Sequence, residues 1–308
     1  MDKAYDVIII GAGPAGMSAA VYGIRAGLSV LMLDKAGMAG GQILNTYEVE
    51  NYLGFSSISG FELGMKFKEH AEQLGVTVTN GTVKKIIDQD KYKLVETEEG
   101  NYVGKTIVLA TGASHAKLLV PGEEEFSGMG VSYCATCDGA FFRNRTVAVV
   151  GGSDVAVEDA IFLARVCEKV YLIHRRDRLR AAKKLQEALF KLANVEIIWN
   201  TTVTQINGTD MVESLELSNK ETKETSTLSV NGVFIAVGMN PNTGMFQGVV
   251  DMDEKGYVIA GEDCATSNPS VFAAGDLRTK KLRQVVTAVA DGASAIAGCE
   301  AYLSGNDR

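Results

Sequence analysis

The sequence predicts an α/β fold in which one β-α-β unit occurs twice. Two glycine-rich turns carry this prediction, and each follows a continuous apolar run of the kind that forms a buried parallel strand. The first turn is Gly11-Ala12-Gly13-Pro14-Ala15-Gly16, and the second is Gly151-Gly152-Ser153-Asp154-Val155-Ala156. A strand, a glycine-rich turn and a helix in this order form a mononucleotide-binding unit, so we expect two Rossmann-like domains.

The first unit begins with a β-rich run over Tyr5–Ile10. Pro14 falls in the first turn of the next helix, where its missing N–H is not needed. The helix continues to about Ala26, and Gly27 ends it. Ser29–Leu33 is the second strand, which completes the β-α-β unit.

The rest of the first half predicts one helix and a set of short strands. Apolar spacing over Gly60–Leu74 favours an amphipathic helix. Alternating runs near Val83–Ile87, Tyr92–Val95 and Asn101–Val103 predict a small antiparallel meander. Thr106–Ala110 is predicted to be a further buried strand.

The second half repeats the pattern after a connecting segment. Ser114–Gly130 is predicted to be a linker and surface loop, and its acidic run Glu123-Glu124-Glu125 is predicted to be a solvated face. The second β-α-β unit runs from Thr146 to a strand at Val170–Ile173. The later elements expected are a basic helix from about Leu179, strands near Val195–Trp199, Val212–Leu217 and Val233–Ala236, a return linker at Gly238–Gly244, a strand at Val271–Ala274, and a helix from Arg283 to about Leu303.

Composition indicates a soluble enzyme rather than a nucleic-acid or membrane protein. The 308 residues are 46% hydrophobic and 22% charged, with a net charge of −8. A net negative charge argues against nucleic acid and anionic membranes as partners. No apolar run reaches the roughly 18 residues of a membrane-spanning helix. Met1-Asp2-Lys3 leads directly into a strand, with no room for a signal peptide, so we expect a cytoplasmic protein.

The first glycine turn has the features that a dinucleotide requires. Gly11 permits the tight turn, Gly13 lets the backbone approach a pyrophosphate, and Gly16 lets the helix pack closely on the strand. The helix N-terminus supplies free N–H groups and the positive end of its dipole. Asp34 follows the second strand, where a carboxylate accepts hydrogen bonds from a ribose.

The second glycine turn differs in a way that favours NADPH over NADH. Ser153 occupies the close-approach position, and His174-Arg175-Arg176 stands where the first unit has its acid, with Arg180 shortly after. A carboxylate would repel a 2′-phosphate, whereas guanidinium groups bind it in fork geometry. The alternative is that this basic segment is only the solvated start of a helix.

Cys134 and Cys137 are predicted to form a redox-active dithiol. Two intervening residues bring the sulfurs within bonding reach in one turn, and a thiolate then reacts by disulfide exchange. A zinc site would need four ligands, and inert buried cysteines are the other alternative. Asp138 follows directly, where it can exchange a proton with a departing thiolate. The other cysteines, Cys167, Cys264 and Cys299, are expected in the core.

Taken together, these residues resemble the low-molecular-weight bacterial thioredoxin reductases over essentially the whole chain. Cys134–Phe142 is similar to the redox signature of that family, and His174–Ala181 is similar to its NADPH-phosphate signature. The resemblance implies FAD at the first glycine turn. Further FAD contacts that it implies are Gly41, Gln42, Asn51, Ala110, Thr111, Gly112, Gly275, Asp276, Arg283, Gln284 and Val285.

The family architecture implies a three-layer ββα fold for each domain, with the second domain inserted into the first. The FAD domain would comprise 1–114 and 245–308, and the NADPH domain would comprise 115–244. Cys137 would face the flavin, Cys134 would attack oxidised thioredoxin, and Asp138 would act as acid and base. The resemblance also implies a homodimer and rotation of the NADPH domain about its two connections.

Two other functions stay open at this point. Ser153 stands where most members of the family have glycine, which leaves room for a reductase of the same fold that uses another donor, such as ferredoxin. A flavoprotein that binds or senses redox state without turnover is the second alternative. Turnover of thioredoxin with NADPH separates the three.

Overall fold

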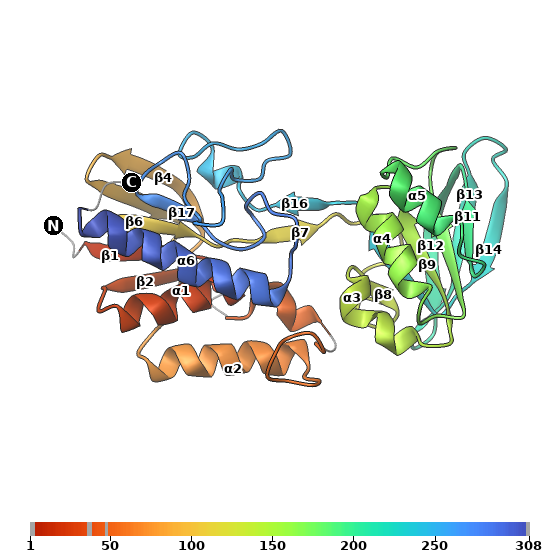
Figure 1. Cartoon of the computed structure of the whole chain (residues 1–308), viewed down its shortest axis with the longest axis horizontal. Coiled ribbons are helices and arrows are strands. Elements are labelled where there is room, and N and C mark those ends of the chain that lie inside the picture. Colours follow the sequence, from red (N-terminus) through yellow and green to blue (C-terminus); the bar gives the residue numbers. More distant parts are fainter. Residues whose placement is uncertain (1–3, 36–38, 47–48, 306–308) are drawn as a thin grey trace. The chain divides into compact units, whose positions relative to one another are not determined.

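The computed structural model describes residues 4–35, 39–46 and 49–305, so Met1–Lys3, on which the expectation of a missing signal peptide rests, lie outside it. The chain divides into two compact units (Figure 1). Unit 1 comprises Met1–Asn45, Asn51–Ser114 and Asn240–Arg308, and unit 2 comprises Thr46–Glu50 and His115–Met239.

Unit 1 is built on a seven-stranded sheet in the order β3-β2-β1-β6-β5-β4, with β17 also paired to β6. Helices α1 and α6 pack against each other beside this sheet (Figure 1). The bounds are β1 Tyr5–Ile10, α1 Pro14–Arg25, β2 Val30–Asp34, α2 Gly60–Gln73, β3 Val78–Asn80, β4 Val83–Gln89, β5 Tyr92–Thr97, β6 Asn101–Leu109, β17 Val271–Ala273 and α6 Val285–Leu303. The predicted parallel β-α-β unit is confirmed: β1 pairs in parallel with both β2 and β6.

The predicted break within residues 101–110 is wrong, because one strand covers this stretch. Strand β6 pairs antiparallel with β5 and parallel with β1, and Gly104 lies opposite both Lys93 and Tyr5. A single strand therefore joins the meander to the parallel sheet. The sequence pattern changed within the strand because only its second half, from Thr106, is fully buried.

Unit 2 has a parallel five-stranded sheet in the order β11-β10-β9-β15-β8 and an antiparallel three-stranded sheet, β12-β13-β14. Together with the helices, these sheets form the α/β architecture that the sequence predicts. The bounds are β8 Val131–Ser132, α3 Ala135–Asp138, β9 Thr146–Gly151, α4 Asp154–Leu163, β10 Lys169–Ile173, α5 Lys183–Leu189, β11 Val195–Ile198, β12 Thr201–Gly208, β13 Val212–Asn219, β14 Thr225–Ser229 and β15 Gly232–Ala236.

Three local predictions in and beside unit 2 are wrong. The basic helix begins at Lys183 rather than near Leu179, because Leu179 and Ala181 are buried in a non-helical stretch that leads into it. The two segments predicted to be irregular linkers contain strands β7 Ala113–His115 and β16 Met239–Pro241, which pair with each other. Strands β12 and β14 were not predicted.

The third wrong prediction concerns the acidic run. Glu123 is only 3% exposed, so it is not part of a solvated face. The other two residues of the run, Glu124 and Glu125, are exposed as predicted.

The structure also bears on the cysteines and on membrane insertion. Cys167, Cys264 and Cys299 are all buried, which confirms their place in the core. Among the helices of the described residues, none has the length and apolar character needed to cross a bilayer.

Candidate active site

The first glycine turn in unit 1 is closed by backbone contacts that only glycine allows. Gly11 has a φ of +108°, and a Cβ at Gly16 would collide with the Gly11 carbonyl oxygen. Gly13 is the N-cap of α1, so the first N–H groups of the helix face outward from this turn. The Asp34 carboxylate accepts a hydrogen bond from the Ala12 N–H at 2.9 Å, which holds the predicted ribose acceptor beside the turn.

A second glycine pair approaches the same turn. The Gly40 N–H donates to the Ala12 carbonyl at 2.8 Å. A Cβ on Gly41, whose φ is +61°, would lie 3.0 Å from the Gly13 Cα. Gln42 is exposed in the short 3₁₀ helix η1, Gly41–Asn45, that follows. Gly13 and Gly41 therefore leave a cradle that a side chain on either residue would narrow.

The segment after β6 closes another side of the first turn. The Ala110 N–H donates to the Ile10 carbonyl at 2.8 Å, and a Cβ on Gly11 would collide with the Ala110 carbonyl oxygen. The Thr111 hydroxyl donates to the Asn242 carbonyl at 2.6 Å, and Gly112 has a φ of +67°. These contacts bring Ala110 to the glycine turn, and Thr111 and Gly112 follow it directly in the chain.

Asp276 supplies the clearest indication of a ligand site. Its Oδ1 atom is buried without a hydrogen-bond partner among the described residues, and burial raises the pKa of this carboxyl. A buried polar atom in a folded protein normally has a partner. The orphaned oxygen and the glycine cradle in the same unit fit a bound group with hydroxyls and a pyrophosphate, such as FAD.

A buried ion cluster fixes the turn that carries Asp276. The Asp291 carboxylate accepts hydrogen bonds from the Gly275 N–H at 2.8 Å, from two guanidinium nitrogens of Arg278 at 2.9 and 2.7 Å, and from the Lys280 ammonium at 2.9 Å. Burial opposes ionisation, but these donors hold the pKa of Asp291 below its ordinary value. Sequence reasoning missed this cluster, because Arg278, Lys280 and Asp291 belong to no motif.

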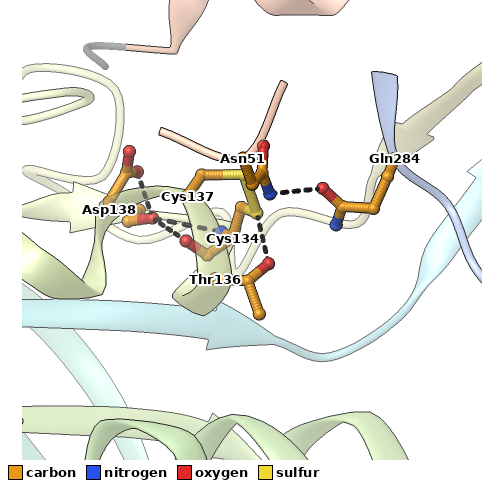
Figure 2. Close-up of a disulfide and its surroundings, with 7 residues drawn as sticks. Asn51, Cys134, Thr136, Cys137, Asp138 and Gln284 are labelled. Atoms are coloured by element: carbon orange, nitrogen blue, oxygen red, sulfur yellow. Dashed lines mark hydrogen bonds between the residues drawn. A yellow bond between two sulfur atoms is a disulfide. The ribbon is translucent and has the colours of Figure 1, made fainter. Parts of the chain in front are cut away.

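The predicted flavin-lining residues lie just before and at the start of α6. Gln284 is the N-cap of the helix and Val285 is its first residue. The Gln284 side chain accepts a hydrogen bond from the Asn51 amide at 3.0 Å (Figure 2). The Arg283 guanidinium lies over the Tyr257 ring at 4.4 Å and donates to the Asp276 carbonyl at 3.3 Å. Unit 1 thus brings together residues that are far apart in the sequence.

The second glycine turn, in unit 2, has a histidine packed against it. The His174 ring occupies the space that a Cβ on Gly152 would need, and His174 is 5% exposed. Its Nε2 lies 3.0 Å from the Arg178 carbonyl oxygen, and burial lowers the pKa of the imidazole. His174 therefore packs against Gly152 and supports the conformation of the turn. Gly151 packs closely against Ala156.

The basic segment folds back over this turn. The Arg180 N–H donates to the Gly152 carbonyl at 2.8 Å, and the Ala182 N–H donates to the Asp154 carboxylate at 2.7 Å. Ser153 is the N-cap of α4, with a φ of −88° that any residue can adopt.

The segment that folds over the second turn carries three exposed arginines. Arg175, Arg176 and Arg180 are all exposed. Within the part of the chain that the structure describes, none of their guanidinium groups forms an ion pair. A cluster of uncompensated guanidinium groups beside a helix N-terminus is suited to a phosphate.

Cys134 and Cys137 form a disulfide at the start of the short helix α3 (Figure 2). Their Cα atoms are 5.3 Å apart. Cys134 is the N-cap of this helix, and its carbonyl accepts hydrogen bonds from the N–H groups of Cys137 and Asp138. Both cysteines are partly exposed. The disulfide favours a redox pair over the two alternatives, a zinc site and inert buried cysteines.

Asp138 lies partly buried beside the disulfide. Burial raises the pKa of its carboxyl, and a hydrogen bond from Ser132 acts in the opposite direction. The Ser132 hydroxyl lies 2.5 Å from Asp138 Oδ2, while Oδ1 is buried without a partner in the part of the chain that the structure describes. A carboxyl with a raised pKa next to a disulfide is suited to proton transfer. Sequence reasoning identified Asp138 but missed Ser132, which lies before the motif.

Comparison with known proteins agrees with this geometry. Residues 5–292 match the family model described as pyridine nucleotide-disulphide oxidoreductase. The chain is 48% identical to a thioredoxin reductase of Listeria innocua over 303 residues, covering 98% of this chain and 95% of that one. It is 46% identical to a thioredoxin reductase of Bacillus subtilis, covering 98% and 96%. A crystal structure of thioredoxin reductase from Streptococcus pyogenes, 47% identical, matches with a TM-score of 0.93 and covers 99% of this chain and 100% of that one.

The glycine turns, the disulfide and the family match define a pyridine nucleotide-disulphide oxidoreductase. Within that class, the chain belongs to the low-molecular-weight thioredoxin reductases.

Proposed function

We propose that this protein transfers electrons from NADPH through FAD and the Cys134–Cys137 disulfide to oxidised thioredoxin. The observation that carries the proposal is the disulfide itself, which lies at a helix N-terminus next to a carboxyl whose burial raises its pKa. When bound, the flavin supplies two-electron transfer between the nicotinamide and the disulfide. The chain's own residues bind the nucleotides, exchange the disulfide and move the proton.

FAD would be held by the cradle in unit 1. The N–H groups at the start of α1 would bind the pyrophosphate, and Asp34 would accept from the adenosine ribose. Asp276 Oδ1, which has no partner among the described residues, would accept a hydrogen bond from a hydroxyl of the ribityl chain. Arg283, Gln284 and Val285 would line the ring system.

NADPH would be held by the second turn, in unit 2. The start of α4 would bind its pyrophosphate, and Arg175, Arg176 and Arg180 would bind the 2′-phosphate. Ferredoxin as the donor is not favoured, because an exposed arginine cluster at this turn is suited to a 2′-phosphorylated coenzyme. His174 would act from behind the turn, through the position of Gly152.

Disulfide exchange would proceed through the two thiols. Two electrons and two protons convert the Cys134–Cys137 disulfide into two thiols. The Cys134 thiolate then attacks one sulfur of oxidised thioredoxin and forms a mixed disulfide, and the other thioredoxin sulfur leaves as a thiolate. Cys137 attacks Cys134 Sγ, which releases reduced thioredoxin and re-forms the internal disulfide. Asp138 would give a proton to the departing thiolate and take one from the attacking thiol.

The domain assignment and the cellular setting belong to the same proposal. The FAD domain would comprise 1–114 and 245–308, and the NADPH domain 115–244. The protein would act as a cytoplasmic homodimer. Its NADPH domain would turn on the connections that contain β7 and β16, so that the disulfide meets the flavin and thioredoxin alternately.

An anaerobic titration of the purified protein tests the coenzyme and the flavin together. Stoichiometric bleaching of flavin absorbance by NADPH, at concentrations where NADH has little effect, is the expected result. Turnover of oxidised thioredoxin under the same conditions would complete the assignment. A protein whose flavin stays oxidised with NADPH but is reduced by ferredoxin would contradict it.

A further inference from the structure

Ser132 links the two ends of the redox turn through a single hydroxyl. Its Oγ accepts a hydrogen bond from the Cys134 N–H at 3.1 Å and lies 2.5 Å from Asp138 Oδ2. Cys134 begins the turn and Asp138 ends it. One side chain therefore contacts the backbone of the thiol proposed to attack thioredoxin and the carboxyl proposed to transfer the proton.

The distances decide where the single hydroxyl hydrogen of Ser132 points. The hydroxyl has two candidate acceptors, Asp138 Oδ2 at 2.5 Å and the Cys134 carbonyl at 3.4 Å. A length near 2.5 Å is typical of a hydrogen bond from a hydroxyl to an ionised carboxylate. The hydrogen therefore lies towards Asp138, and the Cys134 N–H occupies one of the oxygen's lone pairs.

The parallel sheet of unit 2 holds Ser132 in place. Ser132 is the last residue of β8 and pairs in register with Phe234 of β15, a strand that is itself paired with β9. Ser132 is 5% exposed, so water does not compete freely for its hydroxyl. The hydroxyl is a fixed donor on a rigid strand, whereas Asp138 lies on a helix of only four residues.

We propose that Ser132 is a positioning residue that holds Asp138 by Oδ2 and keeps Oδ1 as the oxygen that carries the transferable proton. The inference rests on the proposed role of Asp138. When protonated Asp138 gives its proton to a thiolate, the hydrogen bond from Ser132 to the carboxylate left behind becomes stronger. When it takes a proton back, that bond weakens. Ser132 itself neither gains nor loses a proton.

The pH dependence of turnover follows from this arrangement. Burial raises the pKa of Asp138, and the Ser132 hydrogen bond limits the rise. Among the described residues, no side chain forms an ion pair with Asp138, and the Ser132 hydroxyl is hydrogen-bonded to its carboxyl. Loss of a hydrogen bond to an ionised group raises its pKa by about one to two units.

The experiment compares Ser132→Ala with the wild type, using the pH profile of thioredoxin-dependent turnover of the FAD-loaded enzyme. The limb of the pH profile that we assign to the Asp138 carboxyl should move to higher pH by about one to two units. Anaerobic flavin reduction by NADPH should keep its rate, because hydride transfer does not use the dithiol. Ser132→Thr keeps the hydroxyl and should retain the wild-type limb. Ser226→Ala, the same change on the exposed strand β14, should leave both measurements unchanged.

A double-mutant cycle separates this inference from a structural role and from the proposed function. In Asp138→Asn the assigned limb disappears, and adding Ser132→Ala should then have no further effect on the profile. An equal loss of turnover from Ser132→Ala in both backgrounds, with no shift of the limb, would overturn the inference. A wild-type profile in Asp138→Asn would overturn the role of Asp138 itself. Melting temperatures show that each variant is folded.

Discussion

The Tyr133 hydroxyl donates a hydrogen bond to the buried carboxylate of Glu123 at 2.8 Å. The same carboxylate accepts the N–H groups of Leu118 at 2.9 Å and Leu119 at 2.6 Å. Leu119 is held with a φ of +61°, a backbone region that leucine rarely adopts. Burial, and then the hydrogen bond to Glu123, raise the pKa of Tyr133. Glu123 thus fixes both the loop before it and the residue that precedes Cys134.

Replacing Tyr133 with Phe should lower the free energy of unfolding by about 1.5–3 kcal/mol, the contribution of a hydrogen bond to a charged group. Urea unfolding followed by circular dichroism measures the change, with the denaturant slope expected to stay constant. Glu124→Gln is the matched control. Its side chain is 90% exposed and pairs with Lys117 at 3.4 Å, so its loss should cost less than about 1 kcal/mol. Equal effects of the two substitutions would contradict the assigned role of Glu123.

Glu123 also shows where sequence reasoning fails. Three successive glutamates have the composition of a solvated surface, and nothing local distinguishes the first of them. Its burial depends on Tyr133 and on two backbone N–H groups that a loop brings together. The Asp291 cluster was missed for the same reason, because its partners Arg278 and Lys280 meet it only through the fold.

The parts that could be predicted are those in which the backbone itself imposes a pattern. The glycine turns were recognised because their conformations exclude larger residues, as the positive φ of Gly11 confirms. The disulfide was recognised because Cys-x-x-Cys spacing alone brings two sulfurs together. The strands in the second half of the chain were harder to predict from the sequence. Strand β12 is partly exposed and β14 is mostly exposed, and both are polar, with threonine and serine in place of a clean alternation.

The redox pair yields the most direct test of the chemistry. Cys134→Ser and Cys137→Ser should each abolish thioredoxin-dependent turnover, because neither variant can form the internal disulfide. FAD should stay bound and should still be reduced by NADPH, since that step uses no sulfur. Steady-state assays and anaerobic stopped-flow absorbance report the two steps separately. Cys167→Ser, a buried cysteine outside the pair, is the control for loss of a thiol. Near-normal turnover in either active-site variant would revive a structural role for the disulfide.

The exposed arginines should determine the choice of coenzyme. Changing Arg175 and Arg176 to Ala should weaken NADPH binding by about 1.5–3 kcal/mol per residue, or roughly ten- to hundredfold each. NADH binding should change little, because it has no 2′-phosphate. The ratio of kcat/KM for the two coenzymes measures the effect. Arg165→Ala removes an exposed arginine outside the cluster and should leave that ratio unchanged. If the rates with both coenzymes fell together, these arginines would serve the fold rather than the phosphate.

Asp291 should be essential for the stability of unit 1 and for its hold on FAD. Asp291→Asn leaves the side chains of Arg278 and Lys280, 3% and 6% exposed, without a counter-charge. Breaking a buried ion pair in this way costs roughly 3–5 kcal/mol. The Gly275 N–H loses a charged acceptor, so the adjacent Asp276 should hold FAD less firmly. Urea unfolding and the fluorescence of released flavin measure the two effects. Asp251→Asn, an exposed carboxylate in the same unit, is the control.

The sign of the pH dependence distinguishes the charge of Asp291 from its shape. Because the folded-state pKa of Asp291 is lowered, its contribution to stability is complete above the unfolded value of about 3.9 and is lost as pH falls through the folded value. The difference in unfolding free energy between the wild type and Asp291→Asn should therefore be constant near neutral pH and become smaller below about pH 4. A deficit that persisted unchanged at acid pH would show that packing, rather than ionisation, explains the role of Asp291.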